Sequence, residues 1–93
     1  MNMDIRGKTI FDFCTDKDVL KFITRDVTLS EKEYRSRNTF DDYVSDLRLL
    51  AFITSDDKLG RAVFDISPLL VEWDGDVIDY ATKYREKHGL EEE

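Results

Sequence analysis

Apolar residues between positions 39 and 54 recur at the spacing of one helical stripe. Thr39 is a suitable N-cap, and Asp42 lies three residues later, where its carboxylate can accept from the cap amide and face the positive helix end. The stripe comprises Phe40, Tyr43, Val44, Leu47, Leu50, Ala51 and Thr54. Three more apolar residues lie off it, namely Leu49, Phe52 and Ile53. We therefore predict a central helix whose second half is buried by several neighbours.

Three shorter segments before this helix carry similar patterns. Residues 9–14 place three apolar side chains close together, as a short helix or an anchoring turn would. Thr15 and Asp18 repeat the cap-and-acid spacing ahead of a short apolar face. Ser30 and Glu33 form a further capping box before one or two helical turns. We expect these segments to pack around the central helix.

Residues 48–66 are compatible with two structures. In a hairpin, residues 48–54 and 61–66 would pair across a turn at 56–60, whose glycine suits such a loop. In a helix, one stripe would hold Leu59, Ala62, Val63 and Ile66. Because the stripe that follows Thr39 is continuous and an isolated two-stranded hairpin is marginal in water, we predict helix, with the hairpin as the alternative.

The C-terminal third predicts a helix restart and a last helix. Ser67 caps well and Pro68 is tolerated at a first helical position, so a helix is expected there, with three side chains facing inward. These are Leu69, Leu70 and Trp73. After a break around Gly75, residues 76–88 form an amphipathic pattern with acids at its start, bases at its end and Gly89 as the C′ residue. Its apolar face would hold Val77, Tyr80, Ala81, Tyr84 and His88.

Length and composition limit the architecture to one hydrophobic core, because the chain has 93 residues of which 41% are hydrophobic. We predict a single all-α domain over residues 1–93, a compact bundle of about four to five short helices from which the helix over 76–88 can protrude. Cys14 is the only cysteine, so no intramolecular disulfide can form. No apolar run resembles a signal peptide or a membrane span, which predicts a cytoplasmic protein without a membrane partner.

The net charge of −7 disfavours direct nucleic-acid binding, which normally depends on a basic patch. The excess acid concentrates in the second half of the chain. It can serve solubility or attract a partner with a basic surface.

Residues able to perform catalysis are few. His88 is the only histidine and lies where it serves a helix terminus, and Cys14 sits among phenylalanines, which suits an inert thiol. Asp74, Asp76 and Asp79 lack the spacing of a calcium loop. We expect no enzyme, no metal site and no cofactor.

Aromatic residues near the C-terminus are the strongest candidates for partner contact, because tyrosine and tryptophan commonly anchor protein interfaces. The same residues could instead close the core of so small a domain. The predicted partner-binding set is Trp73, Asp74, Asp76, Asp79, Tyr80 and Tyr84.

Three segments carry a family resemblance. TIFDF at 9–13, FITRDV at 22–27 and NTFDDYVSDLRL at 38–49, with the region around Trp73, cover about half of the chain. Together they resemble the YozE-like, sterile-alpha-motif-like proteins of Gram-positive bacteria and their phages. The resemblance implies a small helical bundle, no known catalytic residues, and a phage or prophage setting.

These observations favour a non-catalytic protein-interaction module, a phage or prophage regulator or inhibitor that binds a host or phage protein. One alternative is an acidic mimic of nucleic acid that inhibits a nuclease or DNA-binding protein. Another is a structural subunit, for which a homodimer is possible.

Overall fold

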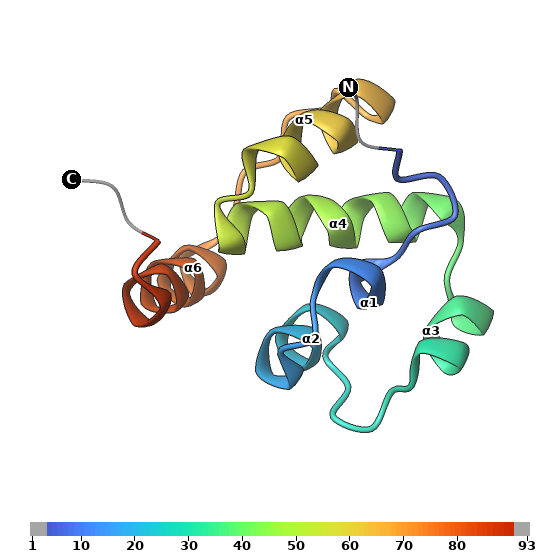
Figure 1. Ribbon diagram of the computed structural model, residues 1–93, viewed down its shortest axis with the longest axis horizontal. Helices are drawn as coiled ribbons and strands as arrows, with labels where there is room; N and C mark the ends of the chain where they lie inside the picture. The colour runs from blue at the N-terminus through green and yellow to red at the C-terminus, as the bar shows by residue number, and fades with distance from the viewer. Residues whose placement is uncertain (1–3, 91–93) are drawn as a thin grey trace.

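The computed structural model describes residues 4–90, and all regular structure in that range is helical (Figure 1). The helices are α1 (Ile10–Phe13), α2 (Lys17–Thr24), α3 (Glu31–Arg37), α4 (Phe40–Thr54), α5 (Asp57–Ile66) and α6 (Gly75–His88). The predicted all-α fold is therefore confirmed, with more helices than expected. The alternative hairpin over residues 48–66 is wrong, because this stretch contains the end of α4 and all of α5.

Helix α4 is the centre of the domain. It contacts α1, α2, α5 and α6, and Figure 1 shows α5 on one side of it and α2 on the other. Thr39 and Asp42 form the predicted capping box, in which the Asp42 carboxylate accepts from the Thr39 amide at 2.8 Å. The buried residues of α4 are Val44, Leu47, Leu50, Ala51 and Ile53. Phe40, predicted to face inward, is 44% exposed, because it occupies the first helical position at the edge of the core.

The first three helices begin at local caps. Thr9 caps α1 in a capping box, and the Ser30 hydroxyl accepts from the Glu33 amide at 3.2 Å to start α3. The predicted cap of α2 at Thr15 is wrong by one residue, because the Asp16 carboxylate accepts from the Asp18 amide at 3.0 Å. Aspartate caps at least as well as threonine, so the helix starts at the later of two suitable residues.

The predicted turn at residues 56–60 is wrong, because this segment begins α5. The Asp56 carboxylate accepts from the Leu59 amide at 3.0 Å and caps the helix. Leu59, Ala62 and Val63 are buried as the helical interpretation expected, whereas Ile66 at the helix end is exposed. An aspartate cap and a helical apolar stripe together outweigh one glycine inside the helix.

The predicted helix restart at Ser67 and Pro68 is also wrong. Ser67 is the C-cap of α5, and residues 67–74 have no regular structure. The Arg48 guanidinium, from α4, donates hydrogen bonds to the carbonyl groups of Ser67 and Leu69. A helix that began here would need those carbonyls as acceptors for its own amides, so their use by Arg48 disfavours a helix in this segment. Leu69 and Leu70, predicted to face inward, are 73% and 89% exposed.

Helix α6 packs against α4 and buries Val77 and Ala81. It starts at Gly75, with Asp74 as the N-cap, one residue before the predicted start. It ends at His88, and Gly89 follows with φ of +67°, the left-handed conformation expected of a C′ glycine.

Candidate functional site

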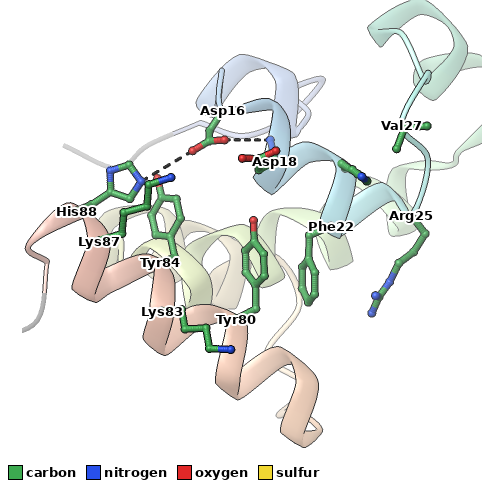
Figure 2. Close-up of a pocket in the computed structure, with 11 residues that line it drawn as sticks. Asp16, Asp18, Phe22, Arg25, Val27, Tyr80, Lys83, Tyr84, Lys87 and His88 are labelled. Atoms are coloured by element: carbon green, nitrogen blue, oxygen red, sulfur yellow. Dashed lines mark hydrogen bonds and ion pairs between the residues drawn. The ribbon is translucent and has the colours of Figure 1, made fainter.

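The six residues predicted to bind a partner do not form one surface. Trp73 packs against Phe52 of α4, with ring centroids 5.3 Å apart. Tyr80 and Tyr84 instead face α2 across a separate groove (Figure 2). Asp74 caps α6, while Asp76 and Asp79 are exposed on that helix. The structure thus divides the predicted site between two grooves and a stretch of exposed acid.

The first groove has a volume of about 720 Å³ and lies between the end of α4, α5 and the segment that follows α5. Large apolar side chains are exposed along its rim and just beyond it. We name these residues the loop face: Phe64, Ile66, Leu69, Leu70 and Val71. Exposed apolar side chains gathered within eight residues of sequence are unusual for an isolated domain and are typical of contact surfaces.

Hydrogen bonds from two arginines connect the segments that line this groove, and the sequence pattern predicted neither arginine. Arg48 fixes the backbone at Ser67 and Leu69 as described above. Arg85 of α6 donates to the Phe52 carbonyl near the end of α4, and its guanidinium carbon lies 5.0 Å from the centre of the Phe52 ring. The last carbonyls of a helix lack intrahelical partners and carry partial negative charge, so a cation satisfies them. The only sequence indication was Arg48 standing directly before an apolar run.

The second groove, which we name the aromatic groove, lies between α2 and α6 and has a volume of about 610 Å³. Phe22 and Tyr80 stack across it with centroids 4.0 Å apart and planes 10° apart. Tyr84 lies one turn further along α6, and its ring centroid is 4.2 Å from that of His88 (Figure 2). The groove therefore has a partly buried aromatic floor built by two helices that both pack on α4.

Charged side chains surround this floor. Asp16 and Asp18 lie at the N-terminal end of α2, and His88 Nε2 is 3.9 Å from an Asp16 carboxylate oxygen. Burial, with smaller contributions from the two carboxylates, raises the pKa of Tyr80 to about 12. The Tyr80 hydroxyl therefore keeps its proton at neutral pH and remains available as a hydrogen-bond donor.

The cysteine does not have the surroundings of an activated nucleophile. Burial raises the pKa of the Cys14 thiol, and its Sγ–H donates to the Asp16 carbonyl at 3.8 Å. A thiol with a raised pKa is mostly protonated at neutral pH and is a weak nucleophile. Within residues 4–90, no three side chains of the His, Cys, Asp or Glu type are placed to share a metal ion.

No family model, curated protein or solved structure matches this chain at a significant level. None of the helices in residues 4–90 has the length and apolar character needed to cross a bilayer.

Proposed function

We propose that the chain is a non-catalytic module that binds another protein through the loop face. The observation that carries this proposal is the exposure of Leu69 and Leu70, 73% and 89%, on a segment that Arg48 fixes in place. A backbone that is already fixed loses little conformational freedom on binding, so more of the transfer free energy of burying its apolar side chains contributes to affinity.

The segment that carries the loop face is acidic. Three arginines also line the groove beside it, but two of them, Arg48 and Arg85, already donate to backbone carbonyls. From position 64 to position 80 the chain has five carboxylates and no lysine or arginine. The carboxylates belong to Asp65, Glu72, Asp74, Asp76 and Asp79. A fitting partner therefore presents an apolar pocket ringed by lysine or arginine, because opposite charges steer association and disfavour wrong partners.

The resemblance to YozE-like proteins implies a phage or prophage setting and no defined activity. In that setting we propose a regulator or inhibitor that acts on a host or phage protein. A protein that mimics only the charge of a nucleic acid needs carboxylates and has no use for exposed leucines. The leucines of the loop face therefore favour apolar contact with a protein over charge mimicry. The two differ in salt dependence, because a charge mimic loses affinity steeply with ionic strength, whereas apolar anchors do not.

The test replaces the two exposed leucines. The double variant Leu69→Ser with Leu70→Ser should keep the melting temperature of the unaltered chain, because both side chains already contact water. It should lose capture of the partner from a lysate of the organism that encodes the chain, with affinity at least about tenfold weaker once the partner is purified.

Leu90→Ser is the matched control, because Leu90 is an exposed leucine that follows α6 and lines neither groove. This variant should capture the same protein as the unaltered chain. Equal capture by the control and by the double leucine variant would contradict the proposal, as would a partner whose contact surface is acidic.

A further inference from the structure

The aromatic groove carries a charge opposite to that of the whole protein. Four of its lining residues are lysine or arginine, against two aspartates, in a chain whose net charge is −7. The cations are Lys21, Arg25, Lys83 and Lys87. Both helices contribute to them, and Figure 2 shows Arg25 beside Phe22, with Lys83 and Lys87 on the same stretch of α6 as Tyr80 and Tyr84.

These four cations make no ion pair with a carboxylate within residues 4–90. Most lysines and arginines within residues 4–90 are likewise without an ion pair, so the feature of these four is that they gather at one groove. Arg35 and Arg37 of α3 do form ion pairs. Arg35 pairs with Asp12 and Glu31, and Arg37 pairs with Asp26 and Glu33. In a chain with 21 acidic residues, a cluster of unpaired cations at one groove is available for an anion from outside.

The floor between the cations suits an apolar anchor. Phe22, Tyr80 and Tyr84 are only partly buried, so parts of their rings remain open to the groove. Phe22 and Tyr80 cover one face of each other, while Arg25 lies over Phe22 and His88 packs on Tyr84. The volume of about 610 Å³ falls within the range that holds a few side chains of a bound segment. An aromatic floor with a charged rim is the arrangement found at the centres of protein interfaces.

We propose that the aromatic groove binds an acidic peptide segment of a partner protein, with an aromatic or leucine side chain on the ring floor. Its carboxylates would meet the lysines and arginine on the rim. This site is independent of the loop face, whose partner is expected to be basic.

The two aspartates of the groove, Asp16 and Asp18, make it a better fit for a peptide than for a nucleic acid. A single strand carries a phosphate at every nucleotide, so a strand along the groove would bring negative charge against Asp16 and Asp18. A peptide can place its carboxylates near Arg25 and Lys83 and present a hydroxyl, amide or cation to the aspartates. The mixed charge of the groove therefore fits the peptide.

A displayed library of random short peptides, panned on the full chain, tests this proposal. Selected peptides should be rich in Asp and Glu next to Phe, Tyr, Trp or Leu. The best peptide, synthesised and titrated, should bind the double variant Lys83→Glu with Lys87→Glu about tenfold more weakly than the unaltered chain. The double variant Lys32→Glu with Lys58→Glu makes the same change in net charge on α3 and α5, and it should bind with unchanged affinity.

Amide chemical shifts of the unaltered chain locate the peptide without relying on any variant. On addition of the selected peptide, the shifts should change along α2 and α6 and stay constant over residues 64–71. The proposal is overturned by a library that yields no peptide or only basic ones, or by equal weakening in both double variants. Shift changes confined to the loop face, or displacement of the peptide by oligothymidylate at equal affinity, would also overturn it.

Discussion

At the scale of the residue, Tyr34 joins α3 to α4 through a partly buried hydrogen bond. Its side chain is 1% exposed, and its hydroxyl donates to the Asp46 carboxylate. Burial raises the pKa of both groups, and for Asp46 the bond from Tyr34 acts in the opposite direction by stabilising the carboxylate. The two groups thus reduce for each other the cost of being removed from water.

Replacing Tyr34 with phenylalanine should therefore lower the free energy of unfolding by about 1 to 3 kcal/mol, because the partly buried Asp46 carboxylate would lose its donor. Urea denaturation at neutral pH measures this change. Tyr43→Phe is the matched control, since the Tyr43 hydroxyl donates at 2.8 Å to the Arg35 carbonyl on an exposed surface. Its expected loss is below about 1 kcal/mol. Equal losses in the two variants would show that burial of the carboxylate does not set the cost.

At the scale of the element, one glycine lies inside a helix and another adopts the left-handed conformation after a helix. Gly60 lies inside α5, and a Cβ added there would meet only Ala51 Cβ, at 3.9 Å, an ordinary contact. Gly89 follows α6 with φ of +67°, where a side chain is strained.

Gly60→Ala should accordingly raise the free energy of unfolding by about 0.5 to 1 kcal/mol, because alanine loses less conformational entropy in a helix. Gly89→Ala should lower it by about 1 kcal/mol. Thermal and urea unfolding of both variants check the signs. If Gly60→Ala were destabilising, α5 would not have room for the methyl group beside α4.

Element starts were predictable from the sequence where the cap is local. Thr39 and Ser30 mark helix starts because a cap hydroxyl and the backbone amide that donates to it lie within three residues of each other. The segment after α5 was not predictable, because Ser67 and Pro68 form a valid local start that Arg48 overrides from 19 residues away. A local pattern contains no information about an arginine that arrives from another helix.

The candidate sites, too, were predictable only where the sequence pattern is local. The spacing of Tyr80 and Tyr84 predicted one shared face of α6, and both residues do line one groove. Which helix stands opposite that face depends on how α2 packs on α4, so Phe22 and Arg25 could not be assigned to the site from sequence. The charge of a groove is set by both of its walls, and an acidic chain can therefore hold a basic groove.

At the scale of the whole molecule, the helices around the central helix α4 differ in how much of their surface they bury. Helix α4 contacts all five other helices and buries five of its own residues. Helix α3 buries only Tyr34, and its ion pairs involve side chains that are largely exposed. Exposed ion pairs contribute little to stability, so α3 should open without the rest of the domain.

Hydrogen exchange measures this difference directly. The amides of Leu50, Ala51 and Ile53 should exchange only when the whole domain unfolds, with a free energy of opening equal to that of urea unfolding. The amides at the end of α3, and that of its C-cap Asn38, should exchange at least about tenfold faster. Opening there exposes one buried side chain, Tyr34, and otherwise breaks hydrogen bonds and ion pairs that lie mostly at the surface. Low concentrations of urea distinguish the two kinds of opening, because the free energy of global opening depends steeply on denaturant and that of local opening does not. Equal protection of α3 and α4 would mean that the Tyr34 to Asp46 bond makes α3 part of the same cooperative unit.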